Sequence, residues 1–151
     1  MAYWLLKSEP DAWSWDQMVK AGAKGTAWTG IRNHTAKLNM MKMKKGDRGF
    51  FYHSNIGKEV VGICEVIREA YPDPTAFDRK DSRFDPKSKK ADPTWFAVDL
   101  RAVGPLERPV TLDQLKRTKG LEQMALIRIG RLSVQPVTPR EYEIVIGLAG
   151  R

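Results

Sequence analysis

Strand-forming segments recur along this chain without a helix between each pair, and this order most constrains its fold. Residues 95–103 (WFAVDLRAV) alternate apolar and polar side chains, which predicts a strand with one buried face. Residues 59–70 (EVVGICEVIREA) are apolar on both faces, as expected of a strand covered by helices. Further strands are predicted at residues 3–7, 48–54 and 131–137. Because regular βαβ alternation is absent, we expect an α+β domain with a small mixed or antiparallel β-barrel of five or six strands, flanked by short helices.

Helix starts are marked by capping boxes, in which a hydroxyl residue precedes Gln or Glu by three positions. The three pairs are Ser14 with Gln17, Thr111 with Gln114, and Thr138 with Glu141. Asn33 is expected to cap a further helix over residues 33–45, and residues 121–126 have helical character. Residues 71–93 contain four prolines and many charges, so we expect a long loop that is functional or mobile.

The size and composition suit one domain spanning residues 1–151. No run of apolar residues approaches the 18 needed for a transmembrane helix, and the first residues lack the pattern of a signal peptide. Cys64 is the single cysteine, which agrees with a reducing, cytoplasmic location.

Positive charge is the first indication of function. The chain carries 26 Lys and Arg against 18 Asp and Glu, a net charge of +8. The excess gathers in residues 32–48 and 79–90. Such clusters attract polyanions, of which nucleic acid is the commonest, although each could also be an ordinary solvated surface.

Catalytic and metal-binding patterns are weak. His34, His53 and Cys64 lie too far apart in sequence to match a zinc motif, so we expect no metal and no cofactor. Cys64 lies in an apolar strand and is expected to be buried and inert. His53 and Ser54 are neighbours on a strand and point to opposite faces, which disfavours a catalytic pair. Glu9 remains a candidate acid or base without an evident partner.

Two tryptophans depart from a simple core role. Trp95 lies on the same face of its predicted strand as Asp99 and Arg101, and it is therefore expected to face away from the main core. Trp28 lies in a polar, glycine-rich segment just before Arg32 and Asn33. An aromatic ring beside a guanidinium and the start of a helix suits a flat ligand with an anion nearby, as in proteins that stack nucleotide bases.

Six segments together resemble the EVE domain family, and they cover essentially the whole chain. They are KSEP (7–10), WTGIRNHTAKLNM (28–40), GDRGFFYHSN (46–55), AYPDPTAFD (70–78), PTWFAVDL (93–100) and RLSVQPV (131–137). The resemblance implies a PUA-like β-barrel, related to YTH and ASCH domains. It also implies a non-catalytic reader of a modified base in an aromatic pocket, with modified cytosine in DNA as the favoured ligand and RNA as a further partner.

The resemblance also assigns residues to the pocket. Trp28 would form a wall of the base pocket. The polar residues around it would bind the base or its phosphates: Lys7, Ser8, Glu9, Arg32, Asn33, His53, Ser54, Asn55, Arg131 and Ser133. His53 and Ser54 can both face the pocket only if the strand ends or bends there, which the following Asn55–Gly57 turn would allow.

The basic clusters would then bind the phosphate backbone through Lys37, Lys42, Lys44, Lys45, Lys87, Lys89 and Lys90. No membrane partner is expected. Two alternatives stay open. One is a hydrolase of a small modified nucleoside, like ASCH relatives, with Glu9 or His53 as acid or base. The other is an RNA-binding module that recognises backbone shape.

Overall fold

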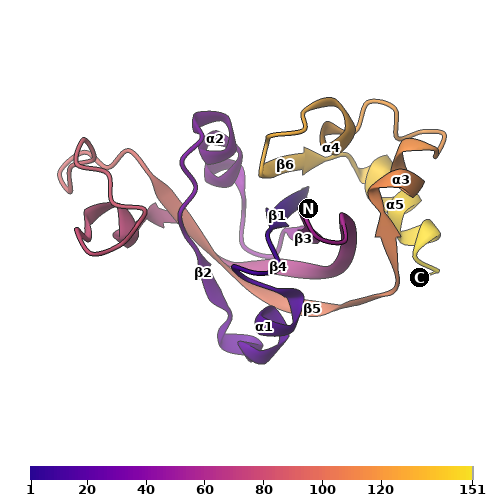
Figure 1. Cartoon of the computed structure of the whole chain (residues 1–151), viewed down its shortest axis with the longest axis horizontal. Coiled ribbons are helices and arrows are strands. Elements are labelled where there is room, and N and C mark those ends of the chain that lie inside the picture. Colours follow the sequence, from indigo (N-terminus) through magenta and orange to yellow (C-terminus); the bar gives the residue numbers. More distant parts are fainter. Residues whose placement is uncertain (151) are drawn as a thin grey trace.

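Six strands form one mixed sheet in the computed structural model, which describes residues 1–150 (Figure 1). They are β1 (Tyr3–Ser8), β2 (Thr26–Trp28), β3 (Arg48–His53), β4 (Glu59–Pro72), β5 (Phe96–Thr111) and β6 (Val134–Val137). The order is β2-β5-β4-β3-β1-β6, with β1 and β3 parallel and the other pairs antiparallel. The predicted α+β class with a mixed sheet is confirmed. Within residues 1–150, β2 and β6 end the order without pairing to each other, so hydrogen bonds do not close the barrel.

Strands β4 and β5 are long and irregular, and their register shifts at four places along the pair. The predicted strand over residues 95–103 continues to Thr111, past Pro105 and Pro109. Strand β2 pairs with β5 only at residues 98–100, which leaves one edge of β5 open beyond that point. A proline is tolerated at such an open edge because no ladder hydrogen bond needs its missing N–H.

Five α-helices cover the sheet: α1 (Trp15–Lys20), α2 (His34–Lys42), α3 (Leu112–Lys116), α4 (Ala125–Arg128) and α5 (Pro139–Leu148). Two 3₁₀ turns, Gly22–Lys24 and Pro74–Phe77, accompany them. All three predicted capping boxes are present, and Asn33 caps α2 as expected. Helix α2 ends three residues before the predicted residue 45, and the helical turn expected over residues 121–126 lies at α4 instead.

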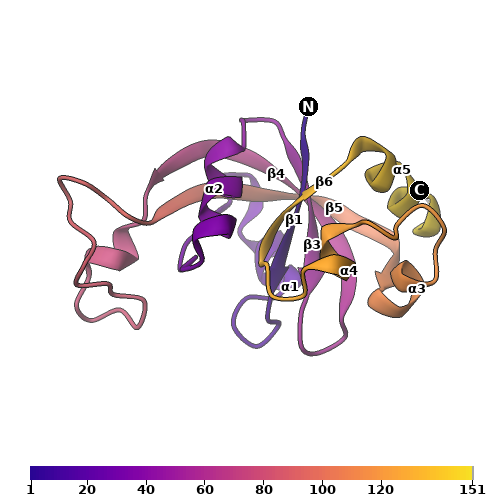
Figure 2. The ribbon, with the colours of Figure 1, turned by 90° about the horizontal axis from the view of Figure 1, so that it is seen from above.

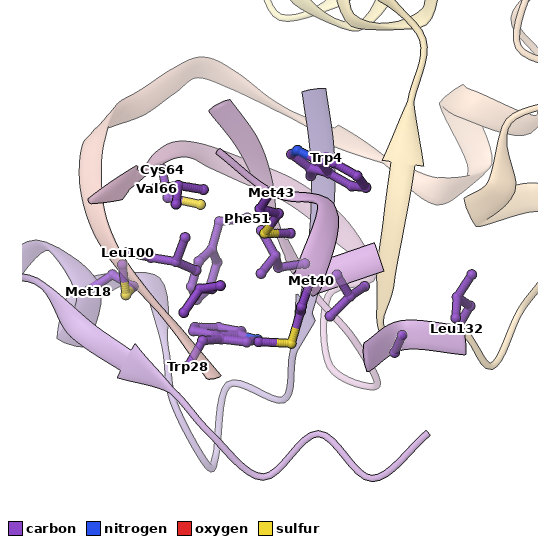
Figure 3. Packing of buried hydrophobic residues seen from close by; sticks show 14 of the residues in the cluster. Trp4, Met18, Trp28, Met40, Met43, Phe51, Cys64, Val66, Leu100 and Leu132 are labelled. Atoms are coloured by element: carbon purple, nitrogen blue, oxygen red, sulfur yellow. The ribbon is translucent and has the colours of Figure 1, made fainter. Parts of the chain in front are cut away.

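The sheet separates two hydrophobic cores because neighbouring residues of a strand point to opposite faces. Phe51 lies in the first core with Trp28 and Met40 (Figure 3), whereas Phe50 lies in the second with Tyr142. Strand β4 contributes apolar residues to both cores, as expected of a strand with helices on both sides of its sheet. Cys64 is fully buried in the first core, and burial raises the pKa of its thiol to about 12, as expected of an inert cysteine.

The segment between β4 and β5 is irregular and projects from one end of the molecule, opposite the end that carries α3 and α5 (Figure 2). Trp95 belongs to neither hydrophobic core, in agreement with its predicted orientation, yet it is buried. Its indole Nε1 donates to Asp85 Oδ2 at 2.7 Å, and its ring packs against His34 at 4.8 Å between centroids. Trp95 thus attaches this loop to α2. Among residues 1–150, no helix has the length and apolar character needed to cross a membrane.

Candidate functional site

A pocket of about 420 Å³ opens where β1 ends beside β2, and its volume is in the range of small-ligand sites. Two tryptophans, small polar residues and charged groups from four separate segments line it. The lining residues are Lys7, Ser8, Glu9, Ala12, Trp13, Thr26, Ala27, Trp28, Thr29, Ile31 and Arg83. Four of the predicted site residues, Lys7, Ser8, Glu9 and Trp28, are therefore brought together here.

A tight turn after β1 shapes one side of the pocket. The backbone N–H groups of Ala12 and Trp13 both donate to Glu9 O at 2.9 Å. Ser8 Oγ donates to Trp13 O, so this hydroxyl holds the turn against the end of the strand. These bonds place the half-buried Trp13 ring beside the pocket, and its indole Nε1 is buried without a hydrogen-bond partner among residues 1–150. Sequence reasoning missed Trp13, although it lies only three residues after the KSEP motif.

Trp28 forms another part of the wall, and it also belongs to the first hydrophobic core. Only 8% of the residue is exposed. Its ring meets Phe51 edge to face, with 5.7 Å between centroids, and Figure 3 shows it next to Met40 as well. Trp28 therefore belongs to the hydrophobic core and lines the pocket at the same time, so a core role does not exclude contact with a ligand.

Lys7 links the pocket to the segment that precedes β6. Its Nζ donates to Gly130 O at 2.5 Å, and its backbone N–H donates to Ser133 O at 2.9 Å. Burial lowers the pKa of this ammonium group. Arg131 and Ser133 consequently lie beside the pocket, but neither lines it.

Arg32 and Asn33 are not placed at the pocket as the sequence predicted. Arg32 uses all five of its N–H donors. The acceptors are Arg83 O twice, and Ile31 O, Asp73 Oδ2 and Thr75 Oγ1 once each. Asn33 Oδ1 accepts from Ala36 N at 2.9 Å and caps α2. Arg32 therefore has no donor left for a ligand, Asn33 uses its side-chain oxygen as a helix cap, and neither residue lines the pocket.

The segment after β3 supports the pocket from behind. Strand β3 ends at His53, and the chain turns at Asn55, whose φ of 65° is in the left-handed region. Ser54 N donates to Ser8 O at 2.9 Å, and Asn55 Nδ2 donates to Glu9 Oε1 at 2.8 Å. The strand ends and the chain turns here, as it would have to for both His53 and Ser54 to face the pocket. Neither residue lines the pocket, however, and Asn55 is connected to it only through its hydrogen bond to Glu9.

His53 instead supports helix α1, because its Nε2 accepts from the backbone N–H of Trp15 at 3.0 Å. An accepting Nε2 requires the neutral ring. Burial lowers the pKa of His53 below its usual value, and the opposing effects of Glu59 and Asp16 do not overcome it.

A pH dependence of stability follows from this arrangement. The unfolded chain binds the His53 proton more readily than the folded chain, so stability is complete above about pH 6.5 and falls as the pH drops below it. Urea unfolding midpoints measured from pH 7.5 to 5.0 should decline in the wild type and decline less in His53→Gln, whose amide oxygen can still accept. His34→Gln, at an exposed histidine, is the matched control. Equal declines in wild type and His53→Gln would contradict the assignment.

The predicted phosphate-binding lysines do not form one cluster. Lys42, Lys44 and Lys45 border a second hollow of about 400 Å³ near Met1 and Asp47, beside the first residues of β1. The pocket lies at the other end of this six-residue strand, roughly 17 Å away at ~3.3 Å per residue. Lys37 lies over the Trp95 ring with its Nζ 5.5 Å from the centroid. A third group is exposed on the projecting loop, namely Lys87, Lys89 and Lys90.

Arg83, Thr29 and Ile31 line the pocket without having been predicted. Thr29 and Ile31 flank residues that were singled out, so their proximity was a usable signal. Arg83 comes from the projecting loop, and its Nη1 donates to Thr29 Oγ1 across 54 residues of chain at 2.8 Å. No local pattern indicates such a contact. Within residues 1–150 no three His, Cys, Asp or Glu side chains gather closely enough to hold a metal ion.

Comparisons with known proteins agree on one family. The family model described as "EVE domain" matches residues 2–148. Thymocyte nuclear protein 1 of Mus musculus is 39% identical over 165 residues, which cover 97% of this chain and 73% of that protein. A solved structure from Rhodopseudomonas palustris is 53% identical with a TM-score of 0.84, covering 99% of this chain and 94% of that one. Human thymocyte nuclear protein 1, solved in complex with DNA containing 5-methylcytosine, is 32% identical with a TM-score of 0.94, covering 100% and 99%.

Proposed function

Because this chain belongs to the EVE domain family, we propose that it binds DNA and holds one modified cytosine base of that DNA in the pocket between β1 and β2. The observation that carries the proposal is the pocket itself, which joins two tryptophan rings to a rim of hydrogen-bonding side chains. The human relative solved with 5-methylcytosine DNA supports the choice of ligand.

The chemistry of the pocket suits a base extruded from its stack. Proteins that hold such bases pack them against aromatic rings and hydrogen-bond the base edge. Trp13 and Trp28 supply the rings, and Ser8, Glu9 and Thr29 supply polar groups. A methyl or hydroxymethyl group on the base would add apolar contact or one hydrogen bond, worth roughly 1–3 kcal/mol in discrimination.

The basic surfaces support a polyanionic partner. The three lysine groups described above are separated across the molecule, and lysine–phosphate contacts contribute affinity that is independent of base sequence and weakens with salt. Selectivity would then come from the pocket, and general affinity from the net charge of +8.

The pocket favours a binding role over a catalytic one. Its titratable lining residues are Lys7, Glu9 and Arg83, and each is engaged with a partner inside the fold. His53, the other candidate acid or base, accepts a backbone hydrogen bond through Nε2 and does not line the pocket. A hydrolase would need a group poised to transfer a proton to the substrate, and no observation favours one here.

A binding titration at about 0.1 M salt tests the proposal. Matched single- and double-stranded DNA and RNA probes would differ in one base, which is cytosine, 5-methylcytosine, 5-hydroxymethylcytosine or methylated adenine. We expect a preference of about tenfold or more for a modified cytosine in DNA, equivalent to ~1.4 kcal/mol. Equal and strongly salt-dependent binding to every probe would overturn the reader function and leave a shape- or charge-based binder.

Filling the pocket should remove this preference. Ala12 is exposed and lines the pocket from the turn after β1, so Ala12→Phe adds a ring at the pocket without disturbing the core. We expect binding to the preferred probe to weaken at least about tenfold, while the unmodified probe loses less. Ala23→Phe introduces the same ring at an exposed alanine outside the pocket and should bind as the wild type does. An Ala12→Phe protein that keeps full preference would contradict base binding in this pocket.

A further inference from the structure

Arg83 closes one side of the pocket from the projecting loop. Its side chain crosses Gly30, where a Cβ atom would lie 2.5 Å from Arg83 Cδ. Gly30 also has a φ of +83°, so glycine is required there both for the backbone and for the passage of Arg83. The guanidinium then reaches Thr29 at the pocket, where Nη1 donates to Oγ1.

The guanidinium of Arg83 has N–H donors that are not used within the fold of residues 1–150. Nε and Nη2 donate to the two carboxylate oxygens of Asp81 at 2.9 and 3.0 Å, and Nη1 donates to Thr29. Arginine has five N–H donors, so two have no acceptor within residues 1–150. The Arg83 side chain is 43% exposed, and these donors are therefore accessible at the pocket mouth.

The position of Arg83 is fixed by an ion pair behind it. Arg32 donates to the backbone carbonyl of Arg83 twice, through Nε at 3.1 Å and Nη2 at 2.7 Å. Arg32 Nη1 is held at 3.0 Å by Asp73 Oδ2, and the Asp73 side chain is fully buried. An otherwise irregular loop thus presents one arginine to the pocket from a rigid support.

We propose that Arg83 binds the phosphate of the nucleotide whose base enters the pocket, and that the Arg32–Asp73 pair is the positioning element that holds it there. This inference rests on the proposed function. A guanidinium matches phosphate oxygens with paired hydrogen bonds, which a lysine cannot reproduce. Asp81 is not displaced in this arrangement, because it accepts from Nε and one N–H of Nη2, while one N–H of Nη1 and one of Nη2 remain for the phosphate.

This role differs from that of the lysine groups. Lys42, Lys44 and Lys45 lie at the opposite end of β1 and would contact phosphates irrespective of which base is enclosed. Arg83 lines the pocket itself, so its phosphate contact forms together with base enclosure. Its loss should weaken binding most when a preferred base occupies the pocket.

The test compares Arg83→Gln with Arg79→Gln, a control at an exposed arginine of the same loop. The probes are single-stranded DNA with one 5-methylcytosine, and the same DNA with an uncharged methylphosphonate replacing the phosphate on the 5′ or the 3′ side of that base. We expect Arg83→Gln to weaken binding of the unaltered probe about tenfold and Arg79→Gln about twofold or less. One of the two methylphosphonates should weaken wild-type binding by about the same factor as the Arg83→Gln substitution does. The same methylphosphonate should not weaken the binding of Arg83→Gln any further.

Two outcomes separate the inference from the function on which it rests. If the wild type prefers neither 5-methylcytosine nor 5-hydroxymethylcytosine over cytosine, the proposed function fails, and the role of Arg83 fails with it. If the preference is present but Arg83→Gln binds like Arg79→Gln, only the inference is overturned. The same holds if each of the two methylphosphonates weakens the binding of Arg83→Gln as much as it weakens that of the wild type.

The positioning role has its own readout. Arg32→Lys keeps a positive charge beside Asp73 but removes the fork that holds the Arg83 carbonyl. We expect Arg32→Lys to weaken binding of the unaltered probe, and Arg32→Lys/Arg83→Gln to bind no more weakly than Arg83→Gln alone. Additive losses in this double-mutant cycle would show that Arg32 acts independently of Arg83.

Discussion

Replacing Trp28 with alanine is expected to lower the free energy of unfolding by about 3–5 kcal/mol, the usual cost of deleting a large buried ring. Trp28 is 8% exposed and packs edge to face on Phe51, so its removal leaves an unfilled space between the first core and the pocket. Urea unfolding at pH 7 measures the loss, with the slope of the transition checked against the wild type.

Trp13→Ala is the matched comparison, because Trp13 lines the same pocket but is only half-buried. We expect this variant to lose clearly less stability, since more of the ring already contacts water and its indole N–H forms no hydrogen bond within the described residues 1–150. A Trp28→Ala protein within about 1 kcal/mol of the wild type would contradict the core role of Trp28. The large expected loss also makes this variant unsuitable for testing base recognition, for which filling the pocket at Ala12 is cleaner.

Replacing Asp73 with alanine is expected to have a similarly large effect, about 3–5 kcal/mol, because it removes a fully buried carboxylate and leaves the mostly buried Arg32 guanidinium without its ion-pair partner. The Asp73 carboxylate accepts four hydrogen bonds, from Gly30 N, Arg32 Nη1, Thr75 N and Thr75 Oγ1. Without it, Arg32 loses its ion-pair partner and the loop loses its anchor. Urea unfolding should show the loss, and limited proteolysis with trypsin should cut faster at Arg79 and Lys80.

Asp92→Ala is the control for this prediction, since Asp92 is exposed in the same segment. Its stability should stay within about 0.5 kcal/mol of the wild type, as is usual for surface substitutions. If Asp73→Ala were as stable as Asp92→Ala, the anchoring role of the ion pair would be wrong.

Acid should weaken the same anchor. Burial by itself would raise the pKa of Asp73, but the hydrogen bonds from Gly30, Thr75 and Arg32 outweigh it, and the pKa lies below its usual value. The contribution of this carboxylate to stability is therefore complete above the unfolded pKa of about 3.9 and is lost as the pH falls through the lower folded pKa. Asp73→Asn should lack this part of the acid dependence.

Local signals in the sequence were sufficient for much of the fold. The capping boxes at Ser14, Thr111 and Thr138 are all present in the structure, because each depends on groups only three residues apart. The main strands follow from apolar patterns for the same reason. The extension of β5 beyond residue 103 was missed because an open edge, which tolerates proline, is a property of the assembled sheet.

Part of the pocket was also accessible from sequence. Lys7, Ser8 and Glu9 share one motif at the end of a strand, and Trp28 lies in another. Both motifs resemble a known family, and this resemblance is sufficient to assign them to one site.

The roles of the arginines were decided by tertiary structure. Arg32 sits near Trp28 in sequence and was expected at the ligand, but Asp73, Thr75 and Arg83, which lie 41 to 51 residues away, accept from four of its five donors. Arg83 gave no local signal and reaches the pocket from a loop. The sequence by itself determined the helix caps, the main strands, the family and the pocket motifs, because these depend on neighbouring residues or on whole-chain similarity. Which charged side chains are free and which are internal supports depended on contacts between distant segments, and these form only when the chain has folded.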